Sequence, residues 1–385
     1  MQSCFHFTAG FAIFCALVVT PAYVVAGVKY SDGDKYVKIG SHMQLQYHQE
    51  NPDNGPTTDE IFFRRLKFSI EGSTYRDWLG KIQVDLGKAK EDNEVDIKEA
   101  FFQYHGMKNI KLRIGNDNFP FSREVLTSSK RQQLVERTFV GDHNYGTPDK
   151  NLGIHLTGNN GSKKITWGAS AAFATIDPDV NKLDFDTPAN RNEDFNEGLM
   201  IGGRIDYHPF GYLKFSQGDF SGDTRATIGI AAYSWNNDGD NNSYTPPDGD
   251  PDLLKADVDS VNGFEISAAL RAVGFSIDAE YNTFDADTVE PGLTGGIYSN
   301  GSTTLSNAAI EGGYMFDKTI ELVAGYQTQD ADGYATAWNR TSVGLNWFIN
   351  RHNLKFQFTY RIGENLDGLQ NNNSDEMFLQ GQFVF

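Results

Sequence analysis

Residues 354–362 read LKFQFTYRI, and residues 377–385, at the end of the chain, read MFLQGQFVF. In the first stretch polar residues alternate with the apolar residues Leu354, Phe356, Phe358, Tyr360 and Ile362. The second stretch repeats this alternation and ends on an aromatic ring. A period of two over about ten residues is typical of a strand with one face towards lipid and the other towards a wet lumen. Both stretches therefore predict strands of a transmembrane β-barrel.

Similar alternating segments, bounded by polar turns, recur along the whole chain. With the two quoted stretches there are sixteen, at residues 36–47, 61–71, 78–87, 96–105, 110–116, 151–158, 163–174, 198–208, 224–235, 262–271, 274–284, 306–316, 319–327, 338–349, 353–362 and 376–385. Short connections, such as 106–109 and 317–318, alternate with long polar ones, such as 236–260 and 285–305. An even strand number and this alternation are characteristic of outer-membrane barrels. The connection 209–223 is an exception, because it is long where a short turn is expected.

Composition narrows the class of protein further. Beyond residue 26 no run of about 18 apolar residues occurs and the mean hydropathy is -0.47, so helical membrane spans are excluded. The net charge of -18 argues against nucleic-acid binding. It is compatible with loops that face lipopolysaccharide through bridging divalent cations. The sequence therefore predicts an all-β, antiparallel barrel in the outer membrane of a Gram-negative cell.

The amino-terminal segment has the features of an export signal. Residues 1–26 contain the apolar run FAIFCALVVTPAYVVA and end in a small residue, Ala26. We predict a secretory signal peptide at 1–26, followed by a barrel domain at 27–385. A retained membrane anchor is the less favoured alternative, because the run is short and contains proline. Both cysteines, Cys4 and Cys15, lie in this segment, so the mature chain is predicted to contain no disulfide and no thiol-bound metal.

Aromatic side chains gather towards the ends of the predicted strands. Examples are Trp235, Tyr281, Trp338 and Phe385, which we interpret as parts of the two interfacial girdles of a membrane barrel. The alternative is a soluble barrel or sandwich with an aromatic core. The strand faces opposite the apolar ones carry Lys, Glu, Asp, Gln and Gly, which favours a wet lumen.

The longest unpatterned stretch of the first half is NDNFPFSREVLTSSKRQQLVERTFVGDHNYGTPDK, at residues 116–150. It is too long for an ordinary loop and too apolar for a solvated one. We predict that this third loop folds inward and constricts the pore, so that its charges set the selectivity. Its polar residues include Ser122, Arg123, Glu124, Thr127, Ser128, Ser129, Lys130, Arg131, Glu136 and Arg137.

Four motifs follow one another in the first half of the chain: IFFRRLKFSIEG at 61–72, DWLGKIQVDL at 77–86, IGNDNFPFSREVLTSS at 114–129 and VERTFV at 135–140. In these motifs the chain resembles the phosphate-selective porins O and P of Gram-negative outer membranes. The resemblance implies a trimeric, sixteen-stranded porin with an inward-folded third loop. It also implies a passive channel whose basic lining favours small anions such as phosphate, without enzymatic activity and without a cofactor.

The resemblance further implies that Arg64, Arg65 and Arg137 lie at the pore constriction. Guanidinium groups offer forked donors to phosphate oxygens and have no proton equilibrium near neutral pH. Additional candidates for the constriction are Lys67, Arg123, Ser128, Ser129 and Lys130. Strict alternation places Arg65 on the lumen face but Arg64 on the lipid face. Arg64 therefore requires either a bulge or a snorkelling position at the membrane interface.

Two charge patterns bear on the permeant. Family members often have a lysine near positions 115–118, where this chain reads Gly-Asn-Asp-Asn, so weaker anion binding is expected here. Predicted lumen-facing basic residues are Lys38, Arg65, Lys67, Lys81, Lys111, Arg113, Arg204, Lys355 and Arg361. Predicted lumen-facing acidic residues on later strands are Glu265, Asp278, Glu280, Glu311 and Glu321. A basic wall facing an acidic wall would set a transverse field across the pore.

Other functions have weaker support in the sequence. No HExxH, Gly-x-Ser-x-Gly or P-loop motif occurs, and the eight histidines show no metal-ligand spacing. The enzymatic alternative is an outer-membrane barrel hydrolase that uses His42, His105 or His155 in the lumen. Two further alternatives are a general porin without phosphate selectivity, whose surface loops are acidic, and a surface adhesin or phage receptor.

Overall fold

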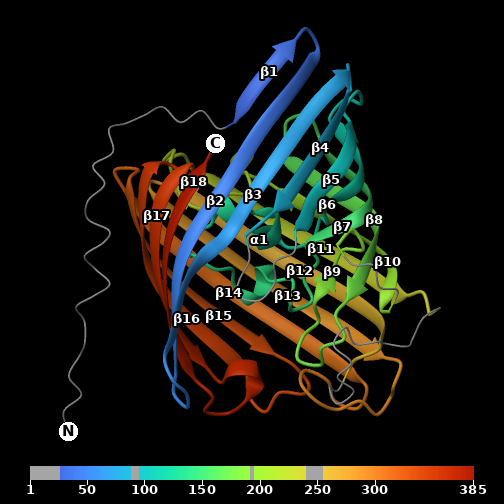
Figure 1. Cartoon of the computed structure of the whole chain (residues 1–385), viewed down its shortest axis with the longest axis vertical. Helices are drawn as coiled ribbons and strands as arrows, with labels where there is room; N and C mark the ends of the chain where they lie inside the picture. The colour runs from blue at the N-terminus through green and yellow to red at the C-terminus, as the bar shows by residue number, and fades with distance from the viewer. Residues whose placement is uncertain (1–26, 88–94, 191–194, 240–254) are drawn as a thin grey trace.

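The computed structural model describes residues 27–87, 95–190, 195–239 and 255–385. The predicted signal peptide lies outside these ranges. Within the described residues, sixteen antiparallel strands, β2–β8 and β10–β18, form a closed barrel (Figure 1). Each strand pairs with the next one along the chain, β8 pairs with β10, and β18 returns to pair with β2. The predicted sixteen-stranded antiparallel barrel is confirmed.

The wall strands are β2 (Lys35–Pro52), β3 (Thr58–Tyr75), β4 (Trp78–Asp85), β5 (Asp96–Tyr104), β6 (Ile110–Asn118), β7 (Lys150–Asn159), β8 (Ile165–Ile176), β10 (Glu197–Tyr207), β11 (Arg225–Asn237), β12 (Val258–Ala272), β13 (Phe275–Thr288), β14 (Ser302–Phe316), β15 (Ile320–Asp330), β16 (Trp338–Asn350), β17 (Leu354–Glu364) and β18 (Ser374–Val384). Two short strands accompany them: β1 (Val28–Asp32) extends the edge of β2 beyond β18, and β9 (Phe185–Asp186) pairs with β8. Each predicted segment overlaps one wall strand.

Burial alternates along the strands in the sense opposite to that of a soluble protein. In β17 the polar Lys355, Gln357, Thr359 and Arg361 are buried inside the barrel, and the apolar Ile362 is exposed on its outer surface. Large apolar side chains cover the outside of most other strands in the same way. This distribution is the one expected for a barrel whose outer face contacts lipid. It disagrees with the alternative of a soluble barrel.

The helices of the structure are short. They are α1 (Arg123–Leu126) and the 3-10 helices η1 (Ser129–Arg131), η2 (Phe139–Gly141) and η3 (Leu366–Gly368). In the part of the chain that the structure describes, no helix is both long enough and apolar enough to cross a membrane.

The third loop, residues 119–149, joins β6 to β7 and lies inside the barrel, where it carries α1, η1 and η2 (Figure 1). It reaches the opposite wall by polar contacts. Arg123 Nε donates to Asp278 Oδ1 of β13 at 3.0 Å, and Gln133 Nε2 donates to Glu321 Oε1 of β15 at 2.8 Å. Lys355 Nζ of β17 donates to a backbone carbonyl of the loop, that of Gln132, at 2.8 Å. The loop therefore crosses the lumen and rests on the far wall.

An apolar core fills the space between the third loop and the wall. Phe119, Phe121, Phe139 and Tyr145 of the loop pack there with Tyr233, Trp235, Phe284 and Trp338 of the wall. Trp235 and Trp338 are only 0% and 4% exposed, so the prediction that they belong to an interfacial girdle is wrong. Both occupy inward positions of their strands, in phase with buried neighbours such as Tyr233. Tyr281 and Phe385 do face outward.

The long connection between β10 and β11 also turns into the lumen, from the end of the barrel that carries the short turns. Gln217 N donates to the carbonyl oxygen of Arg131 in the third loop at 3.0 Å. Arg271 Nη2 of β12 donates to the carbonyl oxygen of Ser216 at 2.8 Å. These contacts explain the unexpected length of the connection, because it reaches the third loop from the end of the barrel that carries the short turns. Together the two segments fill the lumen along the later strands and leave space along the early ones.

Candidate functional site

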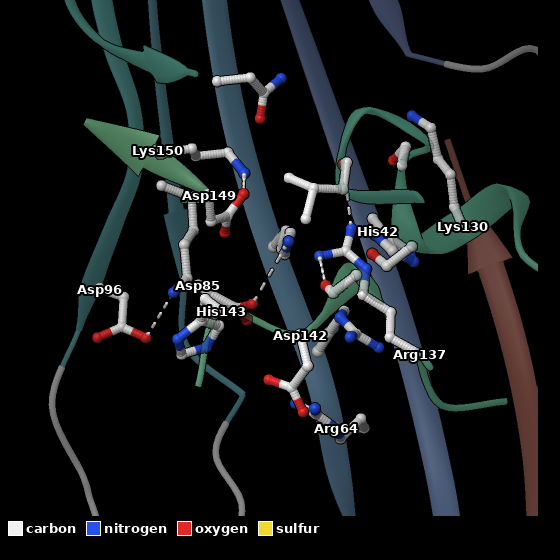
Figure 2. A pocket seen from close by; sticks show the side chains of 18 of the residues that line it. His42, Arg64, Asp85, Asp96, Lys130, Arg137, Asp142, His143, Asp149 and Lys150 are labelled. Atoms are coloured by element: carbon white, nitrogen blue, oxygen red, sulfur yellow. Dashed lines mark hydrogen bonds and ion pairs between the residues drawn. The ribbon is translucent and has the colours of Figure 1, made fainter. Parts of the chain in front are cut away.

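A cavity of about 930 Å³ lies between the third loop and strands β2–β5 (Figure 2). Its basic lining residues are Arg64, Arg65, Lys67, Lys81, Lys98, Lys130, Arg137, Lys150, Arg340 and Arg361. Its acidic lining residues are Asp85, Asp96, Glu99, Glu136, Asp142, Asp149 and Asp186. A confined, wet space with this lining is suited to charged solutes, and basic residues exceed acidic ones.

Arg64 reaches the cavity because β3 contains a β-bulge. The register pairs Gln44 with Arg65 and Leu45 with Phe63, so Arg64 is the extra residue. A bulge locally changes the direction of side chains, which lets two consecutive arginines face the same lumen. Of the two positions that the sequence left open for Arg64, the structure has the bulge rather than the snorkelling side chain at the interface.

The three predicted arginines have different partners. Arg64 makes a two-point ion pair with Glu136 of the third loop: Nε to Oε1 is 2.8 Å and Nη2 to Oε2 is 3.2 Å. Arg65 is buried and donates from Nη1 to the amide oxygen of Gln44 at 2.9 Å. Arg137 donates only to backbone carbonyls of its own loop, including that of Val125 at 3.3 Å. Among the described residues, no carboxylate lies within ion-pair distance of Arg65 or Arg137.

Most of the lysines in the cavity are neutralised by neighbours. Lys67 lies 3.8 Å from Asp85, Lys98 lies 3.3 Å from Asp96 and Lys150 lies 2.9 Å from Asp149. Lys81 contacts Glu99. Lys130 differs, because within the described ranges its ammonium group has no acidic partner. Ser128 and Ser129 line the cavity beside it.

Arg123 is the one predicted site residue that the structure places outside this cavity. Its guanidinium is buried against Asp278 of the later wall and lies 5.4 Å from the ring centre of Phe215. The cause is the single turn of α1, which points successive side chains in different directions. Val125 and Leu126 of the same turn face the cavity. Ser122 is used locally as well, since its Oγ accepts a hydrogen bond from Val125 N and caps the helix.

The acidic wall does not face an open pore, contrary to the prediction of a transverse field between two walls. Glu265, Asp278, Glu280, Glu311 and Glu321 are all buried behind the third loop. Arg204 pairs with Glu265 at 2.8 Å, and Arg271 pairs with Asp278 at 2.6 Å. The carboxylates that face the basic residues across the cavity come instead from the third loop, namely Glu136, Asp142 and Asp149.

Two titratable groups of the third loop have strongly shifted pKa values. Burial alone would raise the pKa of Glu136, but the charges of Arg64 and Arg65 lower it to about 2. Burial alone would lower the pKa of His143, but the Asp184 carboxylate, 2.6 Å from Nδ1, raises it to about 9. At neutral pH the loop therefore presents an anionic Glu136 and a cationic His143 to the cavity.

Two further residues of the cavity or its surroundings clarify the charge pattern. Asp117, in the stretch where family members often have lysine, is buried against Arg113 and does not line the cavity.

Arg340 was not among the site residues predicted from the sequence. Its guanidinium lies 4.3 Å from the ring centres of both Phe139 and Trp338, and it lines the cavity with Arg361. The inward phase of Trp338, Arg340 and Ser342 along β16 was the available signal.

The three histidines considered for a hydrolase do not converge. His42 lines the cavity, His105 is exposed at the end of the barrel, and His155 bonds to Ser170 at 2.8 Å on β8. Within the described ranges, no three His, Cys, Asp or Glu side chains are grouped to hold a metal ion. The His155 and Ser170 side chains are both buried, and neither lines the cavity.

Comparison with known proteins agrees with the motifs. Residues 37–210 match the family of phosphate-selective porin O and P. Porin O of Pseudomonas aeruginosa is 31% identical over 115 residues, which cover 29% of this chain and 26% of that protein. An uncharacterized protein of Aquifex aeolicus is 27% identical over 128 residues, or 30% of its length. The matched segment thus spans less than a third of either relative. The resemblance to the family is confirmed.

Solved structures resemble the whole barrel. The anion-selective porin from Comamonas acidovorans matches with a TM-score of 0.59 at 10% identity, over 91% of this chain and 100% of that one. The outer-membrane channel DcaP of Acinetobacter baumannii gives 0.58 at 11% identity, over 94% and 100% of the two chains. The trimer form of OmpT of Vibrio cholerae gives 0.58 at 13% identity, over 91% and 99%. These likenesses establish a shared fold.

Proposed function

We propose that this chain is a member of the phosphate-selective porin O and P family, whose model matches residues 37–210, and that it forms a passive outer-membrane channel for small hydrophilic solutes. The channel favours anions such as phosphate. Arg65, Lys130 and Arg137 attract the anion as it passes, and the hydroxyl groups of Ser128 and Ser129 donate hydrogen bonds to it.

One observation carries this proposal. Among the described residues, Arg65, Lys130 and Arg137 line the cavity without a carboxylate partner, whereas Lys67, Lys81, Lys98 and Lys150 are each paired with an acid. Unpaired cations in a confined space create a positive potential that concentrates anions. Charged side chains at a constriction set the selectivity of channels in the same way.

Reversal potentials in a potassium chloride gradient test the proposal. We expect the wild-type channel to prefer chloride. Reversing one charge within about 4 Å of the permeant ion changes its energy by about 2 kcal/mol even at the permittivity of water. Arg65→Glu and Arg137→Glu should therefore each lower the anion-to-cation permeability ratio about tenfold or more. Lys108→Glu, in the exposed turn between β5 and β6 and outside the cavity, is the matched control. A cation-preferring wild type, or arginine variants that behave like the control, would contradict the proposal.

A general porin with only weak anion preference is the second candidate. It is favoured by the seven carboxylates that line the same cavity as the ten basic residues. Adding inorganic phosphate to a channel that carries chloride current separates the two candidates. A phosphate-binding channel is blocked in a saturable manner, whereas a general pore shows only the change expected from ionic strength.

We also propose that the chain assembles as a homotrimer. The support is the trimer form in which OmpT of Vibrio cholerae, a barrel of similar fold, has been solved. Folded protein in mild detergent should migrate as a high-mass band on gels and convert to the monomer on heating. A folded monomer under the same conditions would contradict the trimer.

A further inference from the structure

Glu136 occupies the donors of Arg64 that an anion would use. The contacts from Nε to Oε1 at 2.8 Å and from Nη2 to Oε2 at 3.2 Å form the parallel, two-point arrangement that guanidinium also makes with phosphate. At Arg64 the protein's own carboxylate therefore stands where two oxygens of a permeant anion would bind.

The pair is open to the cavity. The side chains of Arg64 and Glu136 are 34% and 16% exposed, and both line the cavity. An anion in the cavity can therefore reach Arg64 without a movement of the backbone. Gln46 Nε2 of β2 donates to Glu136 Oε1 at 3.1 Å. Glu136 consequently keeps a partner on the wall when Arg64 turns to another anion.

Two further guanidinium groups lie beside the Arg64–Glu136 pair. Arg65 follows Arg64 on β3, and Arg137 follows Glu136 on the third loop; both line the cavity, and neither has an acidic partner among the described residues. Figure 2 shows Arg64 and Arg137 in the same part of the cavity. Three free guanidinium groups would hold a doubly charged anion for a long time. Conduction requires binding that is weak enough for the ion to leave.

We propose that Glu136 is a built-in competitor that sets the affinity of the channel for oxyanions. This inference rests on the proposed anion-channel function and refines its substrate class. Glu136 competes with permeants that offer two acceptor oxygens to Arg64, such as hydrogen phosphate. Chloride makes no two-point contact of this kind. Glu136 therefore weakens the retention of phosphate more than that of chloride, and so keeps phosphate moving through the pore.

The test is the block of chloride current by inorganic phosphate in planar bilayers. Hydrogen bonds to charged groups are strong enough that freeing Arg64 in Glu136→Gln should lower the half-blocking phosphate concentration about tenfold or more. The current carried by phosphate alone should fall, because release is slower. Glu136→Asp keeps the charge but is too short for the two-point contact, and it should fall between wild type and Glu136→Gln.

The control is Glu71→Gln, which removes a carboxylate from the same strand as Arg64 but outside the cavity. Its half-blocking concentration should change less than about threefold. If the wild-type channel prefers anions but Glu136→Gln has the same half-blocking phosphate concentration as wild type, the proposal that Glu136 competes with phosphate is overturned. If Glu136→Gln does not assemble, the Glu136→Asp variant decides. A half-blocking concentration equal to that of wild type would then overturn the proposal, because the charge of residue 136 alone would account for its effect. A wild type without anion preference overturns the proposed function itself.

Discussion

At the scale of single residues, the electrostatic role of each basic side chain depends on its nearest neighbour. Arg65 and Lys67 lie two residues apart on the same face of β3, and both line the cavity. Lys67 has Asp85 at 3.8 Å, whereas Arg65 has the neutral amide of Gln44. Two cations that are equivalent in the sequence therefore differ in the positive charge that they offer to a solute.

His143 provides a prediction at this scale. Its raised pKa of about 9 means that its ion pair with Asp184 stabilises the folded loop fully below the ordinary histidine pKa. This stabilisation is lost as the pH rises through about 9. Because the His143 side chain is 42% exposed, solvent screening keeps the contribution below about 1 kcal/mol. Nuclear magnetic resonance titration of labelled histidine should show the raised pKa in wild type and a value near or below 6.5 in Asp184→Asn.

Limited proteolysis tests whether the His143–Asp184 pair stabilises the third loop and the connection that carries Asp184. Asp184→Asn should be cleaved faster than wild type near residue 184 at pH 7. The difference should vanish at pH 10, where His143 is neutral in both proteins. A difference that persists at pH 10 would assign the effect to something other than the charge of His143.

At the scale of elements, one inserted residue brings Arg64 into the lumen. Since β2 pairs Gln44 with Arg65 and Leu45 with Phe63, Arg64 has no partner in the ladder. The side-chain period of a strand is two, so an extra residue without a bulge would reverse every later side chain. The bulge confines the change to one position and preserves the alternation on both sides.

Deleting Arg64 should therefore remove the bulge and leave the register intact. We expect this deletion variant to assemble as a barrel, while its anion preference is reduced because one guanidinium is lost and Glu136 is left unpaired. Deleting Lys67, at a regular position, should reverse the faces of the rest of β3 and prevent assembly. The heat-modifiable band on gels distinguishes the two outcomes. Equal assembly of both deletion variants would contradict this account of the bulge.

At the scale of the whole molecule, the barrel has an apolar outer surface and also a small apolar core inside its lumen. The third loop and the connection 208–224 fill the side of the later strands, and the cavity remains on the side of the early strands. The chain thereby uses aromatic residues for two purposes. Trp347 faces outward at 49% exposure, whereas Trp235 and Trp338 are packed inside.

Fluorescence in brominated lipid tests this division. In variants that keep a single tryptophan, the emission of Trp347 should be strongly quenched by lipid bromine, because quenching needs close contact. The emission of Trp235 and Trp338 should hardly change, because the barrel wall separates them from lipid. Strong quenching of Trp235 or Trp338 would place them in the interfacial girdle after all.

Local patterns in the sequence were sufficient to predict the barrel, its strand number and the segments that line the candidate site. Alternation with a period of two is a local property, and in LKFQFTYRI it identifies both the strand and its faces without knowledge of any partner. The family motifs likewise predicted Arg64, Arg65 and Arg137 as site residues, and all three line the cavity. Whether Trp235 and Trp338 face lipid or the inside required the tertiary structure, because aromatic side chains suit an interfacial girdle and an internal core equally well.

The tertiary structure also decided which charges remain available. Arg123 pairs with Asp278 of the acidic wall only because the third loop crosses the lumen, a contact between residues more than a hundred positions apart. Arg64 meets Glu136 only because of a bulge that is defined by the register with β2. Charge on a single residue can be read from the sequence, but the pairing of charges depends on distance. That distance is set when the loop folds against the closed barrel.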